Sequence, residues 1–217
     1  MQPRAKPAPP PNKKPIFIAA AAMAIAIWLL WPSTNVANLD SQGSSIVAFG
    51  DSLTAGYGAR PGEDYPSKLA ALINRPVINA GQSGDTTAGA LERVEDDVLA
   101  HDPKIVIVGL GGNDFLRGEP LATTEQNLRA IVREIQANGA MVVLLGFRFP
   151  SLQADYADMY ERVADDERCL LIPGVLAGIL TDPALKSDEI HPNARGYALM
   201  ADRIEAPLAK LLERTSP

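Results

Sequence analysis

Five short apolar segments, separated by stretches with helical periodicity, constrain the fold of this chain more than any other feature of its sequence. Each segment is continuous and rich in β-branched residues, which is typical of strands buried on both faces of a sheet. The segments are IVAFG (46–50), PVINAG (76–81), KIVIVGLG (104–111), AMVVLLGF (140–147) and CLLIP (169–173). The stretches with apolar residues at helical spacing are 65–73, 86–101, 124–139, 156–167 and 195–214. This alternation predicts an α/β domain, a three-layer α/β/α sandwich with a five-stranded parallel sheet.

The N-terminal part of the chain has a different character. Residues 1–15 are basic and proline-rich, which predicts a disordered segment. Residues 16–31 contain no charged side chain, and as a helix they would span about 24 Å of a hydrocarbon core that is about 30 Å thick. We expect an uncleaved transmembrane anchor here, and a cleavable signal peptide is the alternative. Residues 32–44 are polar and rich in turn formers, so we expect a linker that leads into a domain over 45–217.

The charges of the chain are distributed unevenly, which bears on both location and partners. Of the 20 basic residues, four precede Asp40, which leaves 16 against all 26 acidic residues in the remainder. Basic residues before an apolar segment stay on the inner side of a membrane, so the domain is expected to be exported. An acidic body lacks the concentrated Lys and Arg that phosphate contacts require, so we expect no nucleic-acid partner. The single cysteine, Cys169, lies in an apolar run and predicts a buried, inert thiol without an intrachain disulfide.

Ligands of parallel α/β sheets bind at the carboxyl ends of the strands, where three segments of this chain carry polar residues. Ser52 directly follows the first strand in FGDSLTAGYG and is a candidate nucleophile, or the cap of a turn. In NAGQSGDTT, Gly81 and Gly84 permit close approach of the backbone, so an amide there could face a ligand; a plain glycine turn is the alternative. In GLGGNDFL, the side chain of Asn113 is a candidate hydrogen-bond donor, or part of an Asx-turn.

A fourth segment, DEIHPN, contains one of the two histidines of the chain. A single histidine in a loop is usually a solvated polar residue. At this spacing, however, the carboxylate of Asp188 can accept a hydrogen bond from Nδ1–H of His191, which leaves Nε2 free as a base. The other histidine, His101, stands at a predicted helix end, where it suits the helix dipole. No spacing of His, Cys or Asp indicates a metal site.

Together the four segments contain a candidate nucleophile, two candidate donors and a base with its orienting acid, which is the set that acyl transfer needs. The G-x-S-x-G elbow of the α/β-hydrolases is absent, so that fold is not indicated. A phosphate-binding G-x-x-x-x-G-K-[ST] loop is absent as well.

The blocks FGDSLTAGYG, NAGQSGDTT, GGNDFL and DEIHPNARGY, in this order, resemble the four blocks of the SGNH (GDSL) hydrolases. The resemblance covers roughly residues 45–212 and is greatest to the bacterial arylesterase and thioesterase/lysophospholipase branch. It implies a flavodoxin-like sheet with strand order 2-1-3-4-5. It also implies that Ser52, His191 and Asp188 form a catalytic triad, and that Gly81 and Asn113 complete an oxyanion hole with the amide of Ser52.

The function that this resemblance implies is hydrolysis of small carboxylic esters or thioesters through an acyl-serine intermediate, without a cofactor. We expect a monomer on the periplasmic side of the inner membrane, tethered by its N-terminal segment, or a secreted periplasmic form if that segment is cleaved. One alternative is deacetylation of, or acyl transfer onto, a cell-envelope carbohydrate. A second alternative is a catalytically silent, membrane-tethered binding domain.

Overall fold

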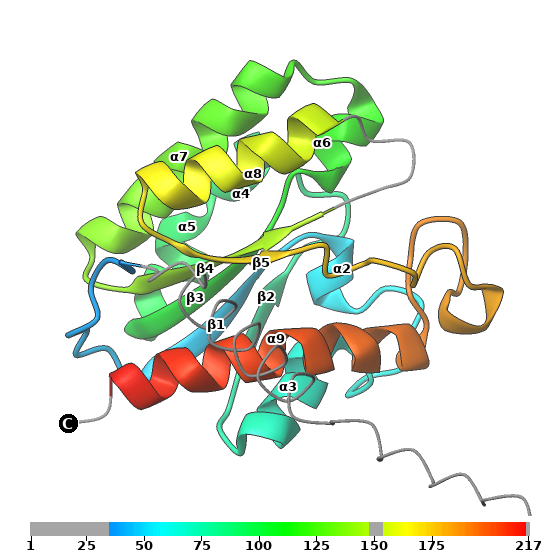
Figure 1. Ribbon diagram of the computed structural model, residues 1–217, viewed down its shortest axis with the longest axis horizontal. Coiled ribbons are helices and arrows are strands. Elements are labelled where there is room, and N and C mark those ends of the chain that lie inside the picture. Colours follow the sequence, from blue (N-terminus) through cyan, green and yellow to red (C-terminus); the bar gives the residue numbers. More distant parts are fainter. Residues whose placement is uncertain (1–34, 148–153, 216–217) are drawn as a thin grey trace, which may run out of the picture. The chain divides into compact units, whose positions relative to one another are not determined.

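The computed structural model describes residues 35–147 and 154–215 (Figure 1). The expected disordered segment, 1–15, and the expected anchor or signal segment, 16–31, lie outside the described residues. Within the described ranges, none of the helices combines the length and the apolar character needed to cross a membrane.

The centre of the domain is a five-stranded, fully parallel sheet in the order β2-β1-β3-β4-β5. Its strands are β1 (Ser45–Gly50), β2 (Ile78–Gly81), β3 (Pro103–Gly109), β4 (Met141–Gly146) and β5 (Leu170–Pro173). The predicted fold class and the strand order implied by the resemblance are both confirmed.

Helices cover both faces of this sheet, as Figure 1 shows. One layer contains α4 (Thr87–Glu92), α5 (Val94–Asp97), α6 (Gly112–Arg117), α7 (Leu121–Ala137) and α8 (Ala154–Asp166). The other layer is formed by α3 (Tyr65–Ile73) packed against α9 (Ala194–Arg214). The short helix α2 (Ser52–Ala55) lies at the carboxyl end of the strands, and the 3₁₀ turns η1 (Leu99–His101) and η2 (Pro183–Leu185) complete the described elements.

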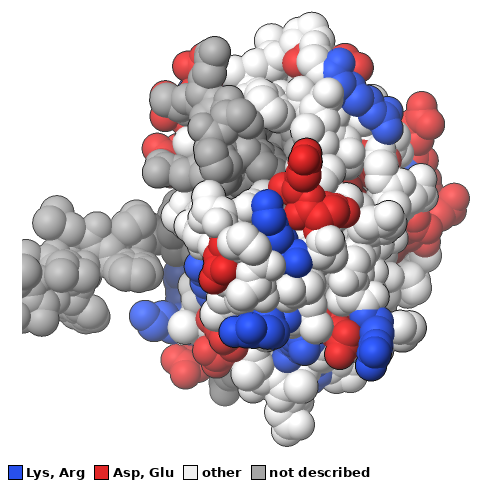
Figure 2. Space-filling view, turned by 90° about the vertical axis from the view of Figure 1, so that its right-hand side faces the viewer, with Lys and Arg blue, Asp and Glu red and all other residues white. Residues whose placement is uncertain are grey.

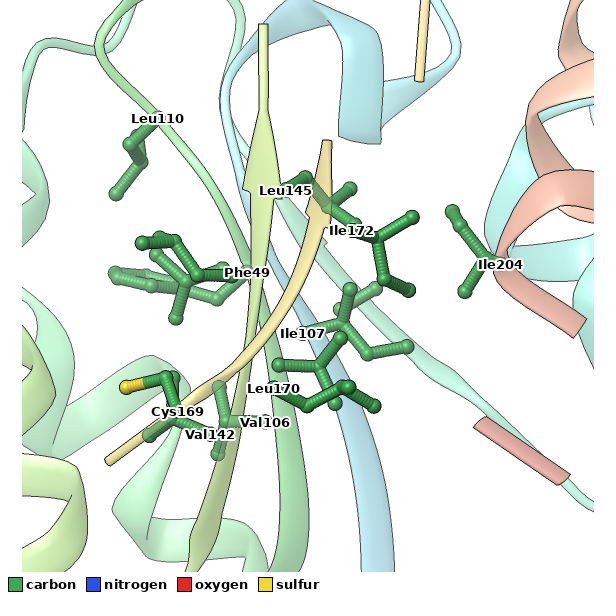
Figure 3. Packing of buried hydrophobic residues seen from close by; sticks show 14 of the residues in the cluster. Phe49, Val106, Ile107, Leu110, Val142, Leu145, Cys169, Leu170, Ile172 and Ile204 are labelled. Carbon is green, nitrogen blue, oxygen red and sulfur yellow. The ribbon is translucent and has the colours of Figure 1, made fainter. Parts of the chain in front are cut away.

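The central strands β1, β3 and β4 are continuously apolar in sequence because they are buried between the two helix layers, whereas the edge strand β2 is only partly buried. Figure 3 shows Ile107, Leu145 and Ile172 on the side of the sheet that faces Ile204 of α9, whereas Phe49 and Val142 point to the opposite face. All five side chains are buried, with exposures of 4% or less. The two packed faces leave the ends of the strands as the place where polar side chains can gather.

The stretch 86–101, expected as one helix, is divided in the structure into α4, α5 and η1. Arg93, between α4 and α5, leaves helical geometry with φ −117° and ψ 8°. Its guanidinium reaches back to the carbonyl oxygens of Gly50 and Ala80 at the ends of two strands, 3.0 and 3.1 Å away. The apolar periodicity continues across this break, which is why the sequence indicated a single helix.

The residues before β1 also differ from the expectation, because 35–44 are packed against the domain and do not form a free linker. Val36 is buried, and the side-chain amide of Asn38 donates to the carbonyl oxygens of Gln136 and Ala140, at 2.8 and 3.0 Å. The amide of Ala37 donates to the carbonyl oxygen of Arg168 at 2.9 Å. The polar composition of this segment reflects hydrogen bonds to helix ends, and the packed domain therefore begins at about residue 35.

Candidate active site

Ser52 is held at the carboxyl end of β1 by a sharp turn between the strand and a helix of only four residues. Asp51 caps this helix, and its Oδ1 accepts a hydrogen bond of 2.9 Å from the amide of Leu53. The helix ends at Gly56, which adopts the left-handed conformation with φ 84°. The hydroxyl of Ser52 is thereby fixed at the edge of the sheet where ligands of parallel α/β proteins bind.

His191 and Asp188 come to Ser52 from a part of the chain that is remote in sequence. Nε2 of His191 lies 2.9 Å from Oγ of Ser52, across 139 positions of sequence. Nδ1 of the same ring lies 2.8 Å from Oδ2 of Asp188. When the carboxylate accepts from Nδ1–H, Nε2 carries a lone pair toward the serine hydroxyl. The structure thus brings together the three residues that the sequence indicated as nucleophile, base and orienting acid.

The loop that carries this pair is fixed by its own backbone. Oδ1 of Asp188 accepts from the amides of Ile190 and His191 at 2.9 and 2.8 Å, and the amide of Ser187 donates to the carbonyl of His191 at 2.9 Å. Burial acts to raise the pKa of Asp188, but hydrogen bonds from the Ile190 amide and from the ring and amide of His191 outweigh it and hold the pKa below its ordinary value. Asp188 is therefore an anion at neutral pH, as an orienting acid must be.

An aromatic side chain that the sequence analysis did not single out lies against the histidine. The rings of Tyr57 and His191 have their centroids 4.5 Å apart and are tilted by 44°. The backbone of Tyr57 is fixed by the hydroxyl of Tyr197, which donates to its carbonyl oxygen at 2.7 Å. Tyr57 itself is 55% exposed, so its ring borders the histidine and remains open to a substrate.

Gly81 was expected to offer its amide to an oxyanion, and the structure gives this glycine a different task. Its amide donates to the side-chain oxygen of Asn79 at 3.0 Å and is already in use. A Cβ at this position would lie 2.6 Å from the carbonyl carbon of Thr54, so only glycine lets α2 approach the end of β2 this closely. Gly81 therefore positions the helix that begins with Ser52.

Two other backbone amides in this region are free to donate. Within the described residues, the amides of Ser52 and Gly84 have no hydrogen-bond partner. Gly84 stands in the loop after β2 with φ 81°, a conformation that favours glycine. The sequence showed two glycines in NAGQSGDTT, and only the backbone geometry reveals which of the two amides is free.

Asn113 is the second residue of α6, and its amide group already has two partners. Nδ2 donates to the carbonyl oxygen of Asp85 at 2.8 Å and to Oδ2 of Asp51 at 3.2 Å. The shorter bond ties Asn113 to the loop that contains Gly84. The longer one joins it to the residue directly before Ser52, so the side chain lies between the two segments where free amides occur.

Two buried carboxyl groups lie beneath these residues. Burial raises the pKa of Asp51 to about 7; the hydrogen bond from the Leu53 amide opposes this, and the nearby carboxylates of Asp85 and Asp114 add to it. Burial likewise raises the pKa of Asp85, against the hydrogen bond and the charge of Arg93, whose guanidinium lies 2.8 Å away. Arg93 joins the ends of β1 and β2 to Asp85 and therefore stabilises the floor of the site. The sequence placed Arg93 inside a helix over 86–101 and gave no sign of this role in the site.

The site lies on the face of the molecule shown in Figure 2, where the carboxyl ends of the strands meet. Charges of both signs are scattered over this face between uncharged residues (Figure 2). In the part of the chain that the structure describes, no group of three or more His, Cys, Asp or Glu could hold a metal ion.

A family model described as the GDSL-like lipase/acylhydrolase family matches residues 48–199. The chain belongs to this family. The arylesterase of Vibrio mimicus is 34% identical to it over 178 residues, which cover 77% of this chain and 89% of the relative. Thioesterase 1/protease 1/lysophospholipase L1 of Escherichia coli K12 is 32% identical over 184 residues, 79% of this chain and 86% of the relative. The crystal structure of TesA superimposes with a TM-score of 0.74 at 30% identity, covering 77% of this chain and 99% of that chain.

Membership of the GDSL-like family makes the chain a serine hydrolase, and it confirms the resemblance drawn from the four sequence blocks. The matched residues include all four blocks, from the strand before Ser52 to the helix after His191.

Proposed function

We propose that this GDSL-like enzyme hydrolyses carboxylic esters or thioesters with Ser52 as nucleophile, His191 as general base and Asp188 as orienting acid. The observation that carries this proposal is the continuous hydrogen-bonded path from the Ser52 hydroxyl through the imidazole to the Asp188 carboxylate, at 2.9 and 2.8 Å. Such a path lets the imidazole take the serine proton during attack and return it to the leaving group.

The reaction then proceeds in two halves. Oγ of Ser52 attacks the carbonyl carbon while its proton moves to Nε2 of His191, and a tetrahedral oxyanion forms. The carbon–oxygen or carbon–sulfur bond breaks, and the proton passes from His191 to the departing alcohol or thiol. Water next attacks the acyl-serine with His191 as base, which releases the acid and restores the Ser52 hydroxyl.

For the oxyanion we propose three donors: the amides of Ser52 and Gly84 and the side chain of Asn113. Both amides are free, and Gly84 replaces Gly81 because the Gly81 amide is bound to Asn79. Asn113 keeps its 2.8 Å hydrogen bond to the carbonyl oxygen of Asp85. The other N–H of its Nδ2, which donates to Asp51 over 3.2 Å, turns toward the developing negative charge. Donors that are fixed before the reaction stabilise the transition state more than the substrate.

The surroundings of the site favour apolar acyl or leaving groups. Of the four large apolar side chains that are exposed in the described residues, three belong to segments of the site: Tyr57, Leu116 and Ile190. Tyr57 contacts the ring of His191, Ile190 precedes His191 in the chain, and Leu116 lies on α6 with Asn113. A panel from p-nitrophenyl acetate to palmitoyl-CoA, lysophosphatidylcholine and acetylated sugars tests this preference. A preference for the acetylated sugars would favour the carbohydrate deacetylase.

The decisive experiment replaces the nucleophile. Ser52→Ala is expected to lower kcat for p-nitrophenyl butyrate on the order of 10⁴- to 10⁶-fold, because no acyl-enzyme can form. Its circular dichroism should match the wild type, and a fluorophosphonate should label the wild type once, at Ser52. Ser83→Ala is the matched control, since Ser83 is an exposed serine on the neighbouring loop. Activity that survives in Ser52→Ala and disappears in Ser83→Ala would overturn the assignment.

We further propose that residues 16–31 anchor the enzyme in the inner membrane, with the catalytic domain on the periplasmic side. The support is the sequence alone: an uncharged segment of 16 residues that follows the basic positions Lys13 and Lys14. The full chain should remain with the membrane fraction after a carbonate wash, and protease added to intact spheroplasts should remove the domain. A mature N-terminus after residue 31 in the soluble periplasmic fraction would show that the segment is a cleaved signal.

A further inference from the structure

Helix α6 is joined to the loop after β2 (residues 82–86, the β2–α4 loop) and to the first residue of α4 by three neighbouring contacts. Nη2 of Arg117 donates to the carbonyl oxygen of Gly84 at 2.6 Å. Nδ2 of Asn113 donates to the carbonyl oxygen of Asp85 at 2.8 Å. The carboxylate of Asp114 accepts from the amide of Thr87 at 3.0 Å and from the Thr87 hydroxyl.

These contacts follow the loop peptide by peptide. Arg117 holds the carbonyl of the 84–85 peptide, Asn113 holds the carbonyl of the 85–86 peptide, and Asp114 holds the amide of the 86–87 peptide. Three consecutive peptide units are therefore oriented by three side chains of one short helix. The contacts set the position of the loop relative to α6, and so the distance between the Gly84 amide and the Asn113 side chain.

The loop needs such restraint because of its composition. Gly84 has φ 81° and lacks the side-chain packing that would hold this conformation, since a Cβ there would have only the Arg117 guanidinium within 4 Å. A glycine without restraint samples many backbone conformations, which would turn its amide away from any fixed point. Asp114 is buried at one end of the contacts, whereas Arg117 is exposed at the other.

We propose that Arg117 is a positioning residue that acts through the Gly84 carbonyl to aim the Gly84 amide at the oxyanion. This inference rests on the proposed function, because it takes the Gly84 amide and Asn113 as the oxyanion donors. A guanidinium–carbonyl bond is charge-assisted and is therefore stronger than a neutral hydrogen bond. Small displacements of a donor cost rate and not binding, since the oxyanion exists only in and near the transition state.

The test uses Arg117→Met, which keeps an unbranched, flexible stem and removes every donor. With the neutral substrate p-nitrophenyl acetate, kcat should fall roughly 10- to 100-fold while KM changes less than about twofold. Arg117→Lys, which retains a donor, should recover part of the loss. The control is Arg162→Met, because Arg162 is an exposed arginine of α8 that pairs with Glu125 of α7 and not with the β2–α4 loop. This control should leave kcat and KM unchanged.

A double-mutant cycle separates positioning from other roles of the charge. If Arg117 acts through the same group of donors as Asn113, the losses in Arg117→Met and Asn113→Ala should combine to clearly less than their product. A rise in KM with unchanged kcat would assign Arg117 to substrate binding, and losses that multiply would assign it to an independent effect; either result overturns the inference. If Ser52→Ala retains activity, the proposed function fails. If Ser52→Ala is inactive and Arg117→Met is fully active, only this inference fails.

Discussion

At the scale of single residues, Asp51, the neighbour of the proposed nucleophile, has an unusual environment for a carboxyl group. The residue is 2% exposed, and its carboxyl group lies near two further acidic groups, Asp85 and Asp114. The group must nevertheless accept hydrogen bonds from Leu53 and Asn113, which hold α2 and α6. Burial with few compensating charges raises the pKa to about 7, so the group titrates near neutral pH.

This raised pKa makes the stability of the protein depend on pH in a defined direction. The unfolded chain releases the Asp51 proton near the ordinary aspartate pKa of 3.8, whereas the folded chain holds it up to a pKa of about 7. Between these values the folded state binds more protons, so the stabilisation is complete below about pH 4 and is lost as the pH rises through 7. The free energy of unfolding of the wild type, relative to Asp51→Asn, should therefore fall from pH 4.5 to 7.5 in urea titrations. A difference that stays constant, or that rises, would contradict this assignment.

At the scale of elements, the sequence predicted the strands well because the central ones, β1, β3 and β4, are continuous apolar runs covered on both sides. The apolar period also located α3, α7, α8 and α9, whose buried faces pack on the sheet. The break at Arg93 was not predictable, because it depends on where a guanidinium finds the carbonyls of Gly50 and Ala80. These carbonyls end two strands that are adjacent only in the folded chain.

In the candidate site, too, the sequence predicted what depends on neighbouring residues and did not predict what depends on contacts between distant segments. The sequence indicated Ser52, Asp188 and His191 as candidates, since each stands in a short block with its own turn chemistry, and the structure brings their side chains within hydrogen-bond distance. It could not separate Gly81 from Gly84, because which amide is free depends on the side chain of Asn79. Nor could it reveal Arg117, whose contact with Gly84 spans 33 positions in the sequence.

The close approach of α2 to β2 gives a prediction about an element. In Gly81→Ala, the new Cβ would lie 2.6 Å from the carbonyl carbon of Thr54, so α2 must move and Ser52 with it. We expect a loss of about 1–3 kcal/mol in the free energy of unfolding, as for other overpacked sites, together with a reduced kcat. Gly146→Ala at the end of β4 is the control, because its Cβ would meet its nearest neighbours at an ordinary 3.4 Å. Equal melting temperatures and activities in the two variants would show that α2 adapts without cost.

At the scale of the whole molecule, the domain is larger at its N-terminal end than the sequence pattern indicated. The polar stretch 35–44 contributes the buried Val36 to the core. It also contributes the two hydrogen bonds that Asn38 donates near the C-terminal end of α7. These two bonds connect the segment to the last turn of α7, through Gln136, and to the residue before β4, Ala140. The segment is remote from Ser52, so its contribution concerns stability and not chemistry.

Two truncated chains test this boundary. A chain that begins at Asn35 should retain the melting temperature and kcat of the domain in the full chain, because it keeps the hydrogen bonds of Asn38 and the buried side chain of Val36. A chain that begins at Ser45 should melt several degrees lower, since it exposes the site of a buried valine, worth about 1.5–3 kcal/mol, and removes the two hydrogen bonds that Asn38 donates to the carbonyls of Gln136 and Ala140. Its kcat at 25 °C should be unchanged, because within the described residues no hydrogen bond joins the removed segment to Ser52, His191 or α6. The variant Asn38→Ala in the longer chain separates the stability contributed by the two Asn38 hydrogen bonds from that contributed by the buried Val36. If both chains melted at the same temperature, residues 35–44 would be the linker that their composition suggests.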